Sequence, residues 1–168
     1  MAQTLGKAAE EVIDGFRRVG WRLALAESCT GGLIAGQLTE VPGASDVVER
    51  GFVVYSNAAK VELLGVPPEV LERFGAVSAE TAAAMAEGAL ARAHAEVALA
   101  VTGIAGPGGG SPAKPVGLVF FGLAHRGAPA RTERHVFAGD RRAVRTASVA
   151  RALDLLRDAA RAAGPVAV

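Results

Sequence analysis

The stretch that decides the fold runs from Arg22 to Glu40 and reads RLALAESCTGGLIAGQLTE. A short apolar run leads into the turn ESCTGG, and an amphipathic run follows the turn. This pattern predicts a buried strand over 21–26 and a helix over 31–40, joined tightly by two glycines. The turn could be a catalytic elbow, a cradle for an anion, or only a connection between the two elements.

Further strands and helices alternate along the rest of the chain. We expect helices over 5–19, 58–65, 68–75, 79–93 and 139–163, and strands over 51–55, 96–102, 116–125 and 131–137. The strand over 51–55 is too apolar to face water on either side, and the strand over 96–102 is expected to be central. The last two strands form a hairpin. The order predicts one α/β domain over 1–168, a three-layer α/β/α sandwich with a mixed, mostly parallel sheet.

Composition narrows the class of protein. The 168 residues carry 18 basic and 17 acidic side chains, a balance that does not suggest a nucleic-acid binder. The single cysteine, Cys29, excludes an intramolecular disulfide and fits a reducing compartment. No apolar run approaches the ~18 residues that cross a bilayer, and the N-terminus lacks the pattern of a signal peptide. We expect a cytoplasmic protein that does not bind membranes.

Three polar segments follow expected strands. They are ESCTGG at 27–32, YSNAAK at 55–60 and TGIAGPGGG at 102–110. Ligands of open α/β sheets bind beyond the carboxyl ends of the strands, so we expect these segments to meet in one crevice. A glycine- and proline-rich loop as long as 103–117 is usually functional or disordered.

The first segment offers two nucleophiles and a helix start. Its backbone N–H groups would favour an anion, and Gly31 and Gly32 would let a ligand approach the main chain. Alternatively, Ser28 or Thr30 only caps the helix. We place Cys29 behind Ser28 as the nucleophile, because no histidine is placed by the sequence to assist a thiol.

The second segment carries Tyr55 and Lys60, with Asn57 as the expected helix cap. A lysine near a helix start and below an apolar strand can be partly buried, which would lower its pKa. A lysine with a lowered pKa can act as a general base for a serine. The alternative is an ordinary solvated lysine.

The third segment resembles a phosphate loop without matching the Walker A spacing. Thr102 could offer its hydroxyl to a ligand and Lys114 could lie over a phosphate, or the glycines could only permit a tight crossing. Arg141, Arg142 and Arg145 could reach a phosphate or form a solvated face. The three histidines lack the spacing of a metal site, and no G-x-S-x-G elbow is present.

Five ordered motifs resemble the CinA family, the C-terminal domain of competence/damage-inducible proteins. They are AESCTGG, ERGFVVYSNAAKVELLGV, GAVSAETAAAMAEGAL, VTGIAGPGGGSPAKPVGLVFFGLA and FAGDRRAVR, and they span nearly the whole chain. Stand-alone family members include nicotinamide mononucleotide deamidases. The resemblance implies an amidohydrolase without metal or other cofactor, which converts nicotinamide mononucleotide and water to nicotinate mononucleotide and ammonia.

The resemblance also implies roles for individual residues. Ser28, Lys60 and Tyr55 match the catalytic residues, and Ser45 matches a second serine that could share or take the role of nucleophile. The expected substrate-binding residues are Thr30, Gly31, Gly32, Asn57, Thr102, Gly103, Gly106 and Arg142. The alternatives are a nucleotide sensor without catalysis, an enzyme that cleaves the phosphate or the glycosidic bond instead, and a scaffold whose glycine loop is purely structural. A homodimer is one assembly that the alanine-rich helix would allow.

Overall fold

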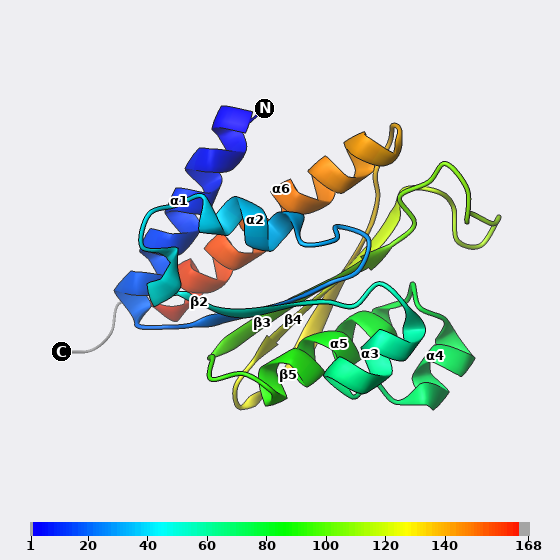
Figure 1. Ribbon diagram of the computed structural model, residues 1–168, viewed down its shortest axis with the longest axis horizontal. Helices are drawn as coiled ribbons and strands as arrows, with labels where there is room; N and C mark the ends of the chain where they lie inside the picture. Colours follow the sequence, from blue (N-terminus) through cyan, green and yellow to red (C-terminus); the bar gives the residue numbers. More distant parts are fainter. Residues whose placement is uncertain (1, 165–168) are drawn as a thin grey trace.

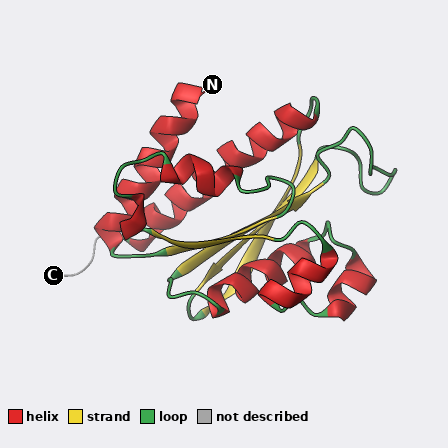
Figure 2. Ribbon diagram, in the orientation of Figure 1, coloured by secondary structure: helices red, strands yellow, loops and turns green. Residues whose placement is uncertain are grey.

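The computed structural model describes residues 2–164, in which a five-stranded sheet lies between two layers of helices (Figures 1 and 2). The strands are β1 (Leu23–Glu27), β2 (Val48–Val53), β3 (Val97–Gly103), β4 (Leu118–His125) and β5 (Ala128–Val136). The helices are α1 (Ala2–Val19), α2 (Leu33–Thr39), α3 (Asn57–Leu64), α4 (Pro68–Phe74), α5 (Ala79–Ala91) and α6 (Arg141–Ala163), with a short 3-10 helix, η1, at Ala44–Asp46.

The order of strands in the sheet is β2-β1-β3-β4-β5. β1 pairs in parallel with both β2 and β3, whereas β4 and β5 add antiparallel pairings as a hairpin. The expected mixed α/β sheet with β3 at its centre is therefore confirmed. The carboxyl ends of the three parallel strands lie at the same edge of the sheet, which is the right-hand edge in Figure 1.

Large and small side chains alternate along the central strands and separate the two helical layers. On β1, Leu23 and Leu25 pack into the core beneath α1, α2 and α6, while Ala24 and Ala26 face α3 and α5 on the other side. Strand β3 repeats this alternation. Because the second face presents mostly alanine, the alanine-rich helix α5 approaches the sheet closely.

Glycines make this close approach possible. A Cβ atom at Gly122 of β4 would collide with the backbone carbonyl of Ala82 in α5, and one at Gly88 of α5 would collide with the carbonyl of Leu64 in α3. Backbone therefore packs directly on backbone, and α5 fixes the position of α3 relative to the sheet.

The second strand differs from its prediction. It covers 48–53 and is an edge strand with partly exposed residues, and Val53 is 52% exposed. The expectation of burial on both sides was wrong, because β2 has a neighbouring strand on one side only. Asn57 does not cap α3: the hydroxyl of Ser56 accepts the N–H of Ala59 instead.

Helices α5 and α6 each begin at a side-chain cap. Ser78 accepts the N–H of Thr81 at the start of α5, and Asp140 accepts the N–H of Ala143 at the start of α6. Across residues 2–164 no helix combines the length and the apolar character that crossing a bilayer requires.

We expect Gly122→Ala to lower the free energy of unfolding by roughly 1–3 kcal/mol, because the new methyl group must push α5 away from the sheet. Gly6→Ala in α1 is the matched control, since its Cβ would meet no atom within 4 Å and alanine favours the helix. Urea unfolding of both variants measures the difference. Equal stability of the two variants would contradict the close packing of α5.

Candidate active site

The loops that follow the three parallel strands are joined by short contacts at one edge of the sheet. The backbone N–H of Ser28 donates to the carbonyl of Val101, and the N–H of Val54 donates to that of Glu27. Farther along, Arg141 donates to the carbonyl of Gly106 and to the hydroxyl of Tyr55. The structure thus brings the three predicted segments together, with the start of α6 beside them.

A buried amine touches a buried hydroxyl at this edge. The Nζ of Lys60 lies 3.0 Å from the Oγ of Ser28 and donates a second hydrogen bond, 2.9 Å long, to the carbonyl of Val54. The lysine is only 1% exposed, and the serine is buried as well. The alternative of an ordinary solvated lysine is therefore wrong.

Burial changes the acid–base chemistry of Lys60. Loss of hydration disfavours the ammonium form and lowers the pKa of the lysine below its ordinary value of 10.5. No carboxylate pairs with the amine within the part of the chain described here. A neutral amine in hydrogen-bond contact with a serine can accept the hydroxyl proton, which makes the serine oxygen a nucleophile.

The start of α2 is already filled by a carboxylate of the protein. The two side-chain oxygens of Glu27 accept the N–H groups of Gly32, Ile34 and Ala35 at 3.0, 3.1 and 2.8 Å. The expectation of free N–H donors at this helix start is therefore wrong, and so is the alternative that Ser28 or Thr30 caps it. The sequence signal that we missed is an acidic residue at the end of a buried strand.

Two other N–H groups of the turn remain free. Those of Cys29 and Thr30 donate to no backbone or side-chain oxygen within residues 2–164, and they follow Ser28 directly. Gly31 and Gly32, with φ of +59° and +96°, connect Cys29 and Thr30 to the start of α2. The hydroxyl of Thr30 is buried and has no partner in the same range. Adjacent free N–H groups beside a nucleophile can bind a developing oxyanion.

Cys29 is poorly suited to act as the nucleophile. The thiol is buried, and loss of hydration raises its pKa to about 11. It stays protonated near neutral pH, and the thiol is far less nucleophilic than the thiolate. The geometry favours Ser28, as the sequence did.

One arginine of α6 contacts the turn directly. The guanidinium of Arg145 donates to the carbonyls of Cys29 and Thr30 at 3.1 and 3.2 Å. Beside it a pocket of about 970 Å³ opens. Its lining comes from α2, the glycine-rich loop and the start of α6, and includes Leu33, Ala105, Pro107, Val116, Arg141, Arg142 and Arg145. Arg142, the predicted phosphate ligand, is exposed in this lining, and Arg141 lies next to it.

The glycine-rich loop is anchored by residues that we expected to bind ligand. The hydroxyl of Thr102 is buried and donates to the carbonyl of Ala76, and the amine of Lys114 donates to the carbonyl of Phe74. Thr102, at the end of β3, and Lys114, in the loop, therefore hold both ends of this region to the chain at and just after the end of α4. A Cβ at Gly103 would collide with the carbonyl of Leu118, so this glycine permits a tight crossing.

Two predicted residues lie apart from the Ser28–Lys60 pair. Ser45 is exposed in η1, which precedes β2, whereas Lys60 follows the far end of that strand. Arg17 of α1 holds η1 through the carbonyl of Gly43. Asn57 is exposed at the first turn of α3. The structure does not bring Ser45 to the lysine, so of the two candidate serines only Ser28 contacts Lys60.

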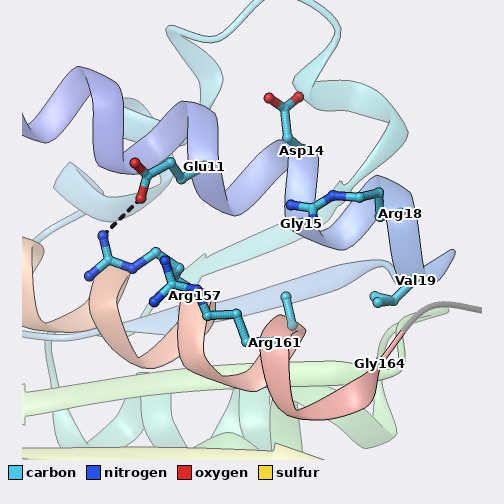
Figure 3. A pocket seen from close by; sticks show the side chains of 9 residues that line it. Glu11, Asp14, Gly15, Arg18, Val19, Arg157, Arg161 and Gly164 are labelled. Atoms are coloured by element: carbon cyan, nitrogen blue, oxygen red, sulfur yellow. Dashed lines mark hydrogen bonds and ion pairs between the residues drawn. The ribbon is translucent and has the colours of Figure 1, made fainter.

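Another pocket, shown in Figure 3, lies between α1 and α6. It contains Arg18, Arg161 and the hydrogen-bonded pair Glu11–Arg157, whose atoms lie 2.9 Å apart. Among the described residues its ionisable lining consists of two carboxylates and three arginines, with no serine beside a lysine as at the end of β1. Across residues 2–164 no three His, Cys, Asp or Glu side chains gather as a metal site requires.

Comparisons of the sequence and of the structure with known proteins identify relatives of one family. The family model of the CinA C-terminal domain matches residues 5–160. A protein from Enterobacter agglomerans named nicotinamide-nucleotide amidohydrolase PncC is 50% identical over 141 residues, which are 84% of this chain and 86% of that protein. The crystal structure of the competence/damage inducible protein CihA from Agrobacterium tumefaciens superposes with a TM-score of 0.90 at 49% identity, and covers 94% of this chain and 95% of its own.

Other relatives are longer proteins. The putative competence-damage inducible protein of Caldicellulosiruptor bescii is 52% identical over 149 residues, which are 88% of this chain but 36% of that protein. The CinA-like protein of Akkermansia muciniphila is 56% identical over 34% of its length. The chain thus spans about a third of the length of these curated relatives.

The lowered pKa of Lys60 predicts a dependence of stability on pH. Between the lowered folded value and 10.5, the unfolded chain binds one more proton at this lysine than the folded protein does. The free energy of unfolding should therefore rise with pH across this window. Urea unfolding at a series of alkaline pH values should show a steeper rise for the wild type than for Lys60→Met. Equal slopes would mean that the amine is not desolvated.

Proposed function

The chain belongs to the CinA C-terminal domain family, and we propose that it is an amidohydrolase that converts nicotinamide mononucleotide and water to nicotinate mononucleotide and ammonia. The observation that carries this proposal is the buried contact between Lys60 and Ser28, beside two free N–H groups. The relative named nicotinamide-nucleotide amidohydrolase supports the choice of substrate.

The proposed reaction begins with proton transfer from Ser28 to the neutral amine of Lys60. The serine oxygen attacks the carboxamide carbon, and the carbonyl oxygen becomes an oxyanion held by the N–H groups of Cys29 and Thr30. One such donor is typically worth about 3 kcal/mol in the transition state. The lysine ammonium then gives its proton to the departing nitrogen, and ammonia leaves.

The second half of the reaction hydrolyses the acyl-enzyme. Lys60, neutral again, takes a proton from a water molecule that attacks the ester carbon. The collapse of this intermediate breaks the bond to Ser28, whose oxygen recovers the proton from the lysine. The products are the free carboxylate of the nucleotide and the unmodified serine.

We assign the phosphate of the substrate to the arginines at the start of α6. Arg142 is exposed in the pocket lining, and Arg141 is fixed there by Gly106 and Tyr55. A guanidinium recognises a phosphate through paired hydrogen bonds. Tyr55 is 60% exposed and its hydroxyl contacts Arg141, so we place it at the rim of the site and not in the proton relay.

Removal of the nucleophile should abolish the reaction. We expect Ser28→Ala to reduce ammonia release from nicotinamide mononucleotide by at least about 10⁴-fold, because no other group can form the acyl-enzyme. Cys29→Ala should retain activity within roughly tenfold, since its thiol is buried and protonated. Ser45→Ala is the matched control and should retain full activity. Substrate binding by the wild type without ammonia release would indicate a nucleotide sensor instead.

Loss of a phosphate ligand should affect binding more than chemistry. We expect Arg142→Gln to raise KM for nicotinamide mononucleotide roughly 10- to 100-fold, the effect of losing one charge-assisted hydrogen bond, with kcat nearly unchanged. Arg134→Gln on β5, an exposed arginine outside this pocket, is the control. Steady-state kinetics with coupled ammonia detection measures both constants. An unchanged KM in Arg142→Gln would move the phosphate away from this residue.

A further inference from the structure

Glu27 is a buried charged residue that the proposed reaction does not use. It is the last residue of β1 and is 1% exposed, and no lysine or arginine within residues 2–164 forms an ion pair with it. Its partners are the peptide N–H groups of Gly32, Ile34 and Ala35. A buried carboxylate without a cation is costly, and several N–H bonds are what offset that cost.

The contacts of Glu27 join three elements around the candidate nucleophile. Its backbone carbonyl accepts the N–H of Val54, which follows β2. Its side chain accepts the N–H of Gly32, just before α2, and those of Ile34 and Ala35 in the first turn of α2. Ser28 follows directly in the chain. Glu27 therefore holds both ends of the turn 28–31: its backbone leads into Ser28, and its carboxylate binds the N–H groups that follow Gly31.

We propose that Glu27 is a positioning residue for the reaction: by clamping the turn 28–31, its carboxylate holds Ser28 against Lys60 and leaves the N–H groups of Cys29 and Thr30 facing the substrate. This inference rests on the proposed function. Without the carboxylate, the three N–H groups of α2 lose their acceptor, and the turn must rearrange to find another. A displacement of about 1 Å at a reacting group can cost about 100-fold in rate.

The test uses steady-state kinetics of ammonia release from nicotinamide mononucleotide. We expect Glu27→Gln to lower kcat roughly 10- to 100-fold with KM within about threefold, because the phosphate contacts on α6 are untouched. A glutamine keeps the shape but turns an N–H donor toward the N–H groups of α2. A merely structural role predicts a lower melting temperature with normal kcat of the folded fraction.

The matched control is Glu96→Gln. Glu96 also accepts a backbone N–H, that of Arg22, but at the opposite end of β1. The Glu96→Gln substitution removes the same charge as Glu27→Gln and should leave both kcat and KM unchanged.

Chemical rescue gives a second readout. In Glu27→Ala, formate or acetate can replace the missing carboxylate, and we expect either anion to raise kcat at least about tenfold in a saturable way, whereas acetamide should not. The same anions should not accelerate the wild type. Where Glu27→Ala does not fold, the kinetics of Glu27→Gln decide alone.

The outcomes separate the two proposals. Ammonia from the wild type, with unchanged kcat in Glu27→Gln, would overturn the positioning role and leave the amidohydrolase proposal standing. No ammonia from the wild type would overturn the proposed function and this inference with it. A fall in kcat that only Glu27→Gln shows, with KM preserved, would support the positioning role.

Discussion

The contact between the amine of Lys60 and the hydroxyl of Ser28 is the constraint on which the candidate site depends. A lysine is seldom buried, because its ammonium loses hydration. Here the side chain comes from α3 and reaches beneath the end of β2 to a serine at the end of β1. The amine can stay there only if α3 is held at a fixed distance from the sheet. Helix α5 provides this, because its backbone at Gly88 packs directly on the carbonyl of Leu64 in α3.

The polar groups around this contact satisfy one another almost completely. The carboxylate of Glu27 occupies the start of α2, Thr102 and Lys114 anchor the glycine-rich loop, and Arg145 holds two carbonyls of the turn. What is left over is the hydroxyl of Ser28 in contact with a lysine of lowered pKa, beside two N–H groups of the turn. The proposed reactivity thus rests on a few donors and one candidate nucleophile that stay unpaired among many groups that are paired.

The fold was predictable because the sequence repeats local patterns. Strands with alternating leucine and alanine, capped helices and a terminal hairpin each have a local signature, and together they indicate an α/β sheet. The bounds of β2 were less accurate, because the apolar run at 51–55 continues beyond the strand. The sequence also led to Ser28, which directly follows β1, and to Lys60, which lies in the first turn of the helix after β2.

Other parts of the site depend on contacts that no local pattern shows. The role of Glu27 arises from residues five to eight positions later, and only the folded turn brings them to its carboxylate. Arg141 and Arg142 are neighbours with the same side chain, so spacing could not tell which one reaches Tyr55. Ser45 and Ser28 were indistinguishable until the strand direction separated them. The assembly state and the substrate-binding roles stay predictions.

The buried thiol of Cys29 has a consequence for the study of motion. It sits in the turn between nucleophile and glycines, it is the one cysteine of the chain, and its raised pKa slows its reaction with alkylating reagents. A reagent can reach the sulfur only when the turn opens. The rate of alkylation of the wild-type protein therefore measures how often this turn opens locally. The measurement needs no introduced cysteine and no global unfolding.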